Sequence, residues 1–246
     1  PDGWWNLHRW DGNGVSVIEA MAAEFGLPQW VFGMRTFDVR ASGAVVAAYT
    51  RDGAWRLACI DDDGLRDIDV PCTDIAAPQW VDDKLVFIGS SADAASAILV
   101  LDPASGAIET LWTSLTVDLD PAGLSVPDSI AFETTDGDTA YGFYYPPCSA
   151  TTAPPTDERP PLIVRGHGGP TGATSPSFSL AIQFWTSRGF AVLDVNYRGS
   201  TGFGRAYREA LYGRWGEADV DDMVRGAEHL VSSGLADPSR LAIRGG

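Results

Sequence analysis

The chain has 246 residues, of which 45% are hydrophobic and 11% aromatic, and its 17 Lys and Arg against 33 Asp and Glu give a formal net charge of −16. This composition is that of a folded globular protein that needs neither disulfides nor a structural metal to complete its core. The surplus of acidic residues repels phosphate backbones and anionic lipid, so we expect neither a nucleic acid nor a membrane surface as a partner.

The three cysteines, Cys59, Cys72 and Cys148, show neither CxxC spacing nor a nearby pair of histidines. They predict reduced thiols, and neither a disulfide framework nor a zinc site. No apolar run approaches the roughly 18 residues of a spanning helix, and the first residues do not form an export signal. We therefore expect a cytoplasmic protein. The chain begins without Met inside a strand-like run, so we expect its true N-terminus, with any signal it carries, upstream.

An internal repeat with a period of 50 residues occupies the first part of the chain. Within each unit, short runs of Val, Ile, Leu and aromatic residues alternate with Asp/Gly turns, which predicts strand, turn and strand. Trp5 recurs as Trp55, and the run Pro28-Gln29-Trp30-Val31 recurs as Pro78-Gln79-Trp80-Val81. Because these tryptophans follow the repeat, we interpret them as core residues.

A period of about 50 residues with about four short strands matches one blade of a β-propeller, in which neighbouring blades cover each other's faces. A third, shorter copy is expected over residues 98–102, with Gly106 closing its turn. Propellers typically need at least about four blades, so we expect more blades before Pro1. The alternative is a sandwich of two similar β-meanders.

The pattern changes near residue 113, and we place a domain boundary between residues 112 and 128, which gives domains of 1–120 and 121–246. Wholly apolar strands that alternate with amphipathic helices are typical of a parallel sheet in an α/β domain. The predicted fold is therefore all-β blades followed by an α/β domain. The expected elements are strands at 130–133 and 139–145, a surface loop at 148–160, strands at 162–164, 190–195 and 241–243, and helices at 179–188 and 219–233.

Two glycine motifs carry the chemistry. Gly166-His167-Gly168-Gly169-Pro170 follows a buried strand, where a backbone N–H can serve an oxyanion hole; a plain glycine-rich turn is the alternative. Gly245-Gly246 ends the last strand and matches the first two positions of the G-x-S-x-G nucleophile elbow. The chain contains no complete G-x-S-x-G, so we expect the serine after Gly246 and interpret the chain as a segment of a longer polypeptide.

Residues 128–246 resemble the first half of the catalytic domain of the prolyl oligopeptidase family, nearest to its acylaminoacyl-peptidase and dipeptidyl-aminopeptidase members. Residues 1–112 are similar to the closing blades of the β-propeller that caps such domains. The motifs that carry the resemblance are Asp136-Gly137 with Tyr141 to Pro146, His167 to Pro170, Asn196 to Gly204, Trp215-Gly216-Glu217 with Asp219 to Asp222, and Asp237 to Arg240 leading to Gly245-Gly246.

The resemblance implies an α/β-hydrolase that uses Ser, Asp and His in that chain order, all beyond Gly246. It implies a serine peptidase that hydrolyses short peptides or aminoacyl amides through an acyl-enzyme and needs no cofactor. An esterase or other amide hydrolase on the same scaffold, or a non-catalytic propeller binding module, are the alternatives. A homo-oligomer is compatible with each of them.

The resemblance assigns one oxyanion donor within this chain, the N–H of Gly169, and such a donor lowers the barrier by roughly 2.7 to 4 kcal/mol. Gly169 and the terminal glycine pair should then be two sides of one pocket. His167 stands where the prolyl oligopeptidase and dipeptidyl peptidase branches have a Tyr, and we expect it to orient the loop through a hydrogen bond. Tyr197 and Phe203 flank a loop at the carboxyl edge of the sheet, so we expect them to line the pocket.

A less favoured hypothesis makes His167 the general base, with Ser200 and Asp194 as its partners, the nearest candidates in the sequence. Asp194 lies in a buried strand and Ser200 lacks an elbow, which argues against it. Arg198 and Asp222 are expected to hold the loop after the strand and the following helix in place.

Overall fold

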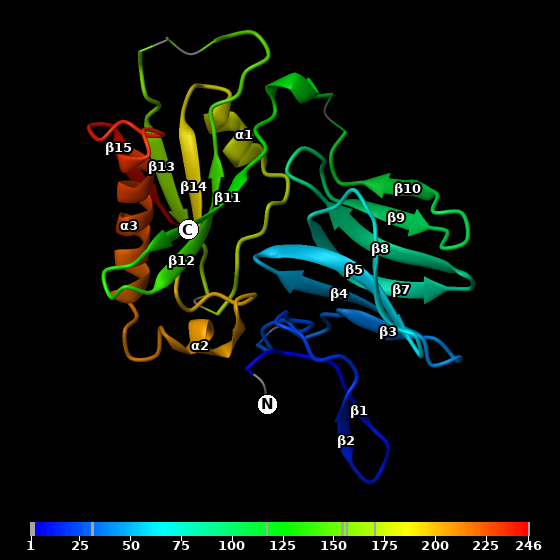
Figure 1. Cartoon of the computed structure of the whole chain (residues 1–246). Helices are drawn as coiled ribbons and strands as arrows, with labels where there is room; N and C mark the ends of the chain where they lie inside the picture. The colour runs from blue at the N-terminus through cyan, green and yellow to red at the C-terminus, as the bar shows by residue number, and fades with distance from the viewer. Residues whose placement is uncertain are drawn as a thin grey trace.

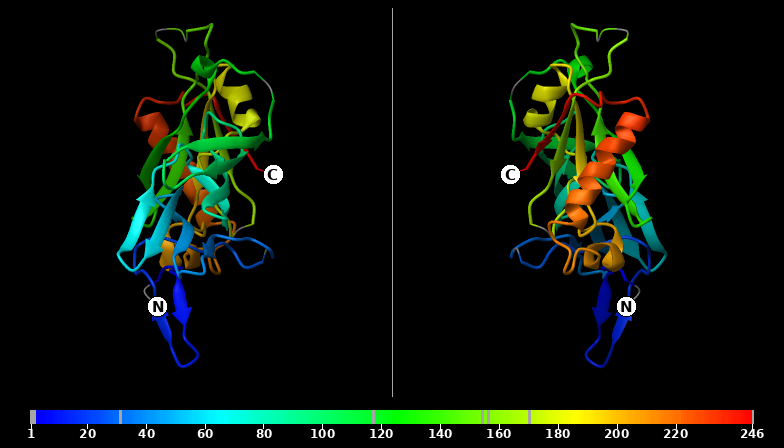
Figure 2. Two further views of the ribbon diagram at one scale, coloured as in Figure 1. Left: turned by 90° about the vertical axis from the view of Figure 1, so that its right-hand side faces the viewer. Right: turned by 90° about the vertical axis from the view of Figure 1, so that its left-hand side faces the viewer.

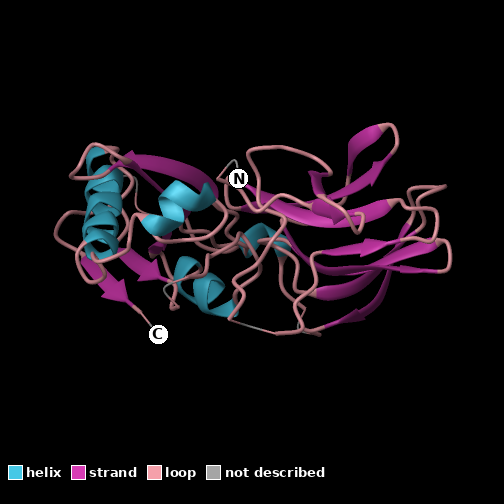
Figure 3. Cartoon of the chain, turned by 90° about the horizontal axis from the view of Figure 1, so that it is seen from below, coloured by secondary structure: helices cyan, strands magenta, loops and turns pink. Residues whose placement is uncertain are grey.

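The computed structural model describes residues 3–30, 32–116, 118–153, 155, 157–169 and 171–245. Within these ranges the strands form one two-stranded, two four-stranded and one five-stranded sheet. The five-stranded sheet lies with the helices in one part of the molecule, and the four-stranded sheets lie in the other (Figure 1, Figure 3). In the described part of the chain, no helix is both long and apolar enough to cross a membrane.

The N-terminal strands β1 (His8–Trp10) and β2 (Val15–Val17) form an antiparallel ribbon that projects from the rest of the molecule (Figure 2). The Asp11 carboxylate closes the turn between them by accepting hydrogen bonds from the N–H groups of Asn13 and Gly14 at 2.8 and 2.9 Å. A short polar side chain that satisfies turn amides in this way explains why the ribbon reverses here.

Two antiparallel meanders follow, and they pack against each other through the side chains that alternate towards their shared interface. The apolar core between them includes Val46, Leu57, Ile75 and Phe87, all at most 2% exposed. The strands of the first sheet, in order, are β3 (Phe37–Val39), β4 (Val45–Arg51), β5 (Ala54–Asp61) and β6 (Gly64–Ile68). The strands of the second are β7 (Asp74–Val81), β8 (Lys84–Ser90), β9 (Ala97–Leu101) and β10 (Ile108–Thr113).

The repeat interpretation needs two corrections. Residues 98–102 do not begin a third unit: residues 98–101 belong to β9, which pairs antiparallel with β8 through Leu85 and Leu101 and is part of the second meander. The two Pro-Gln-Trp-Val runs also differ, because Pro78 lies in a strand with a β-bulge whereas Gln29 and Trp30 lie in a turn. Val31 is outside the described residues. Local sequence similarity did not decide the pairing, because strand pairing depends on neighbours distant in the chain.

The five-stranded sheet has the order β11-β12-β14-β13-β15. β13 (Leu162–Gly166), β14 (Ala191–Asn196) and β15 (Leu241–Arg244) are parallel, which confirms the predicted parallel strands. The two strands predicted before residue 148 form an antiparallel hairpin of β11 (Asp128–Glu133) and β12 (Thr139–Tyr145), and β12 joins the sheet antiparallel to β14.

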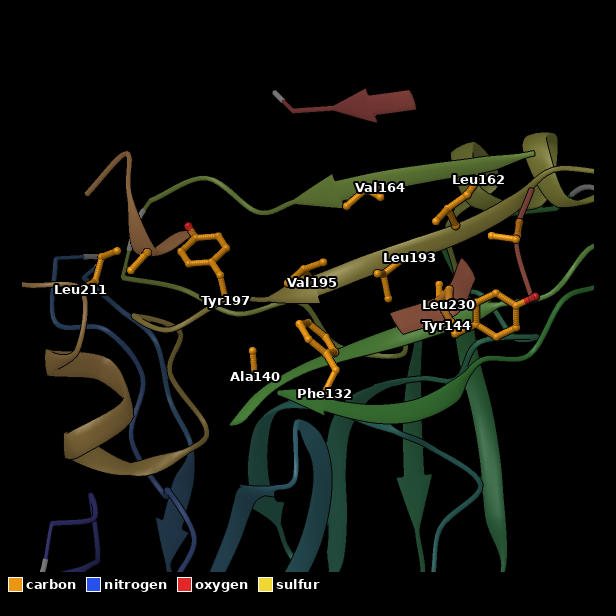
Figure 4. Close-up of a cluster of buried hydrophobic side chains, with 13 residues drawn as sticks. Phe132, Ala140, Tyr144, Leu162, Val164, Leu193, Val195, Tyr197, Leu211 and Leu230 are labelled. Atoms are coloured by element: carbon orange, nitrogen blue, oxygen red, sulfur yellow. The ribbon is translucent and has the colours of Figure 1, made fainter. Parts of the chain in front are cut away.

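Helices cover both faces of this sheet. α3 (Ala218–Ser232) packs on one face, where Leu193, Val195 and Leu230 belong to a buried cluster (Figure 4). α1 (Leu180–Thr186) packs on the other, where Val192 contacts Ile182. Because successive residues of β14 point to opposite faces and helices cover both, this strand is buried throughout, including its polar residues Asp194 and Asn196.

The two predicted helices have recognisable ends. The Ser179 hydroxyl caps α1 by accepting from the Ile182 N–H at 3.4 Å, and Gly189 follows it with φ +85°. Gly234, with φ +77°, lies beyond α3. A short helix, α2 (Gly204–Glu209), and a 3₁₀ turn, η1 (Pro121–Gly123), complete the described elements and had no periodic signal in the sequence.

Candidate active site

The loop after β13 and the end of β15 meet at one edge of the sheet. The two strands are parallel neighbours, with Arg165 opposite Arg244, so their carboxyl ends lie together. A cavity of about 270 Å³ lies at this edge, lined by His167 and Gly168 on one side and Gly245 on the other. The glycine loop and the strand end therefore face a shared cavity, and Gly246 is outside the described residues.

Gly169 has a backbone conformation that requires glycine. Its φ is +142°, and a Cβ at this position would lie 3.0 Å from the Thr171 nitrogen. A side chain would therefore strain the backbone and collide with the next turn of the loop. Gly169 follows Gly168 in the loop but is not itself among the residues that line the cavity. Pro170 is outside the described residues.

The His167 side chain is fixed on two sides. Its ring stacks on Tyr197 with centroids 4.3 Å apart and planes 17° apart, and its Nε2 lies 2.7 Å from the Ser200 Oγ. Its Nδ1 lies 3.0 Å from the Gly168 carbonyl oxygen. Burial lowers the pKa of His167, which favours the neutral imidazole at neutral pH. These contacts tie the glycine loop to the loop that follows β14.

The geometry does not support His167 as the base of a triad with Ser200. The hydroxyl is within reach, but Ser200 is fully buried and its Oγ also lies 2.7 Å from the Tyr197 carbonyl oxygen. The Asp194 carboxylate instead accepts from Thr174 Oγ1 at 2.8 Å and lies 3.7 Å from Arg165. Within the described ranges no carboxylate is hydrogen-bonded to Nδ1, which a triad would require.

Tyr197 and Phe203 were expected to line the pocket. Neither is among the residues that line the cavity at this edge, and both pack against other side chains. Tyr197 is 3% exposed, and its hydroxyl donates to the His167 carbonyl oxygen at 2.9 Å. Phe203 stacks on Tyr141 with centroids 4.5 Å apart. Tyr197 therefore has little surface left for a ligand, whereas Phe203 is half-buried. The sequence did not distinguish an aromatic residue at the edge of a site from one in a packing contact.

Arg198 and Asp222 hold the loop after β14 against α3, as predicted. The Asp222 carboxylate accepts from the Arg198 backbone N–H at 2.6 Å and pairs with its guanidinium at 2.8 Å. The same guanidinium lies 2.8 Å from Asp136 in the β11–β12 turn. Burial raises the pKa of Asp222, while Arg198 opposes that shift.

A second cavity, of about 310 Å³, lies beside the continuation of the glycine loop. Gly172 and Ser175 line one side, and Trp30 and Asp74 from the N-terminal part line another. The Trp30 indole N–H donates to the Thr171 carbonyl oxygen at 2.9 Å, which anchors the loop to this wall. This cavity has no signal in the sequence, because its walls are far apart in the chain.

Glu24 joins the two parts of the chain. It is fully buried, accepts from the Gly202 N–H at 2.6 Å and pairs with Arg208 at 3.0 Å. Burial raises its pKa, and Gly202 and Arg208 oppose the shift. No motif had marked Glu24 or Arg208. In the residues that the structure describes, no group of three or more His, Cys, Asp or Glu side chains is arranged to hold a metal ion.

A mixed sheet with helices on both faces and a glycine loop at its carboxyl edge defines a protein of the α/β class. Residues 176–246 match the sequence profile of the prolyl oligopeptidase family. This match confirms the resemblance that the motifs indicated.

Three similar proteins extend the comparison. The acylamino-acid-releasing enzyme of Arabidopsis thaliana is 41% identical over 86 residues, which are 35% of this chain and 11% of that protein. Dipeptidyl aminopeptidase BIII of Pseudoxanthomonas mexicana is 38% identical over 86 residues, 35% of this chain and 12% of that protein. A crystal structure of puromycin hydrolase matches with a TM-score of 0.93 and 38% identity, over 99% of this chain and 37% of that chain.

Proposed function

We propose that this chain supplies part of the active site of a serine peptidase that hydrolyses short peptides or aminoacyl amides. The observation that carries the proposal is the shared cavity between the glycine loop and Gly245, in a chain that matches peptidase relatives. The matched segments cover only about a tenth of the curated relatives and just over a third of the solved structure. The activity therefore belongs to the full-length gene product.

In the proposed reaction a serine after Gly246 attacks the scissile carbonyl carbon, forming a C–O bond while the carbonyl oxygen takes up negative charge. The Gly169 N–H would donate a hydrogen bond to that oxygen. The glycine loop lies at the carboxyl edge of the sheet, where α/β proteins bind ligands. The serine hydroxyl gives its proton to a general base, which passes it to the nitrogen as the C–N bond breaks and the amine leaves, and water then hydrolyses the acyl-enzyme. His167 would keep the glycine loop in place through Ser200 and Tyr197.

The domain assignment is also part of the proposal. The meanders β3–β6 and β7–β10 would be two blades of a propeller within residues 1–120, and residues 121–246 would be the first half of an α/β-hydrolase domain. Four consecutive antiparallel strands in each sheet, packed face to face, support this. We propose a cytoplasmic location, and the protein could act as a monomer or as a homo-oligomer.

Labelling of the full-length gene product with a fluorophosphonate tests the function, because this reagent traps an activated serine. We expect one labelled serine, located just after Gly246 by mass spectrometry, together with hydrolysis of an aminoacyl reporter, an N-acyl-aminoacyl reporter or puromycin. A protein that is folded but takes up no label would refute the hydrolase and favour a non-catalytic binding module.

Ser200→Ala is the internal control for the identity of the nucleophile. Because Ser200 is fully buried and bonded to His167 and Tyr197, we expect the variant to be labelled to the same extent as the wild type. Hydrolysis should fall only moderately, through loosening of the glycine loop. Loss of labelling in this variant would instead identify Ser200 as the reactive group.

A further inference from the structure

The cavity beside the glycine loop contains a carboxylate without a cationic partner. Asp74 is the first residue of β7, and its neighbour Thr73 donates to the Pro176 carbonyl oxygen at 2.6 Å, which holds this strand end against the loop. Burial raises the pKa of Asp74, and the Ser175 hydroxyl opposes the shift. Within the described ranges no Lys, Arg or His forms an ion pair with this carboxylate, so its charge lacks a counter-ion.

The other walls of this cavity suit an organic cation. They are mainly apolar and include the rings of Trp30 and Trp55 and the side chains of Met34 and Ile75. Aromatic faces attract an ammonium group, and a half-buried carboxylate pairs with one more strongly than it would in water. An anionic ligand would be repelled by Asp74, and an uncharged one would leave the carboxylate unpaired.

The glycine loop contributes a wall to each of the two cavities. A Cβ on Gly172, which lines the second cavity, would lie 3.4 Å from the carbonyl oxygen of Gly168, which lines the first. A ligand whose carbonyl lies at the glycine loop is therefore next to the cavity that contains Asp74.

We propose that Asp74 determines substrate specificity by binding the ammonium group of the substrate in the cavity between β7 and residues 172–175. The inference rests on the proposed peptidase function and narrows it to substrates with a free amino group. The ammonium could be the α-amine of the substrate or a lysine side chain, and the two are distinguished by experiment.

The test compares Asp74→Asn with the wild type in the full-length gene product, using three reporters with the same fluorescent leaving group. These are phenylalanyl, N-acetyl-phenylalanyl and N-acetyl-lysyl amides. Loss of a charge-assisted hydrogen bond predicts a fall in kcat/KM of about 10- to 100-fold for the phenylalanyl reporter, mostly through KM. The N-acetyl-phenylalanyl reporter should be nearly unaffected. A selective loss with the N-acetyl-lysyl reporter would identify a side-chain ammonium as the ligand.

Asp62→Asn, in the exposed turn between β5 and β6, is the matched control because it removes the same charge away from the cavity. It should change none of the three rates. If Asp74→Asn lowers kcat/KM equally for all three reporters, or for none, the inference is overturned. Fluorophosphonate labelling of the same variant then shows separately whether the reactive serine is present.

Calorimetry gives a readout that does not need turnover. Phenylalaninamide should bind the wild type, and its affinity should fall about 10- to 100-fold in Asp74→Asn, whereas N-acetyl-phenylalaninamide should show no such difference. If no serine is labelled, the proposed function fails, and this measurement alone then decides whether Asp74 binds an ammonium group.

Discussion

Arg198 shows how a single charged side chain can organise the edge of a sheet. Its side chain is 2% exposed, yet it pairs with Asp222 on α3 and with Asp136 in the β11–β12 turn. These carboxylates raise the pKa of Arg198, so the guanidinium stays charged. A buried charge with all its partners in place is tolerated, but removal of one member leaves the others uncompensated.

Replacement of Arg198 by Met should therefore lower the free energy of unfolding by about 3–5 kcal/mol, measured in urea titrations. Arg214→Met is the control, since Arg214 pairs with the same Asp136 but is 43% exposed. Exposed pairs contribute at most about 1 kcal/mol. Equal effects of the two substitutions would show that burial does not set the strength of this network.

At the scale of an element, α3 packs against the sheet through a glycine. A Cβ on Gly226 would lie 2.8 Å from the Leu193 Cδ2 and 3.0 Å from the Phe132 Cζ, closer than real contacts allow. Glycine costs a helix interior about 1 kcal/mol relative to alanine. Glycine is nevertheless favoured at this position, because α3 can approach β14 this closely only where there is no Cβ.

Gly226→Ala tests which effect dominates. We expect a net loss of stability of about 1–2 kcal/mol, because the overpacking penalty of about 1–3 kcal/mol exceeds the gain in helix propensity. Val224→Ala, a change on the same helix at a residue that is 49% exposed, should have little effect. A thermal melt that shows Gly226→Ala to be more stable than the wild type would contradict the close packing of α3.

The turn that leads into β15 gives a pH-dependent prediction. Hydrogen bonds from the Ser239 hydroxyl and N–H, and from Arg240, lower the pKa of Asp237 to about 2, from 3.8. A lowered carboxyl pKa contributes stability that is present above the unfolded value and is lost as the pH falls through the folded value.

Asp237→Asn should therefore be less stable than the wild type near neutral pH. The difference should shrink as the pH falls from about 4 towards 2, where the wild-type carboxylate takes up its proton. Urea titrations across this range, with the exposed Asp62→Asn as control, measure the effect. A difference that stays constant with pH would show that the carboxylate charge does not matter in this turn.

At the scale of the whole molecule, Glu24 connects the N-terminal sheets to the α/β part. Its carboxylate reaches Gly202 in the loop after β14 and Arg208 in α2, so both parts must be in place for the ion pair to form. Arg208 in turn lies over the Trp5 ring, 4.1 Å from its centroid. The contact fixes how the two parts meet beside the second cavity, whose lining includes Thr201.

A double-mutant cycle with Glu24→Gln and Arg208→Met measures this coupling. Arg208→Met should cost about 3–5 kcal/mol near neutral pH, because Glu24 is left buried and charged, and the double variant should lose less than the sum of the two single changes. The raised pKa of Glu24 means that the folded state binds its proton more tightly, so the cost of Arg208→Met should fall as the pH is lowered. Additive effects in urea titrations would show that the pair does not couple the two parts.

The parallel strands and both long helices were predictable because their signals are local. Most residues of β14 are apolar, and α1 and α3 are bounded by Ser179, Gly189 and Gly234. The glycine motifs could also be located, since strain at a position such as Gly169 excludes every other residue type. The residues that line the pocket could not be predicted, because an aromatic residue such as Phe203 looks the same in the sequence whether it packs against another ring or faces a ligand.

The amino-acid sequence by itself determined which segments become strands and helices, where they end, and which backbone positions must be glycine, because each depends on residues a few positions apart. Only the tertiary structure decided that residues 98–101 complete the second meander, that Glu24 meets Arg208, and that Asp74 lies beside Ser175 in the wall of one cavity. Those contacts join residues that are not neighbours in the chain, up to 184 positions apart for Glu24 and Arg208. Their free energy depends on burial and on the partners that the fold brings together, and neither is encoded locally.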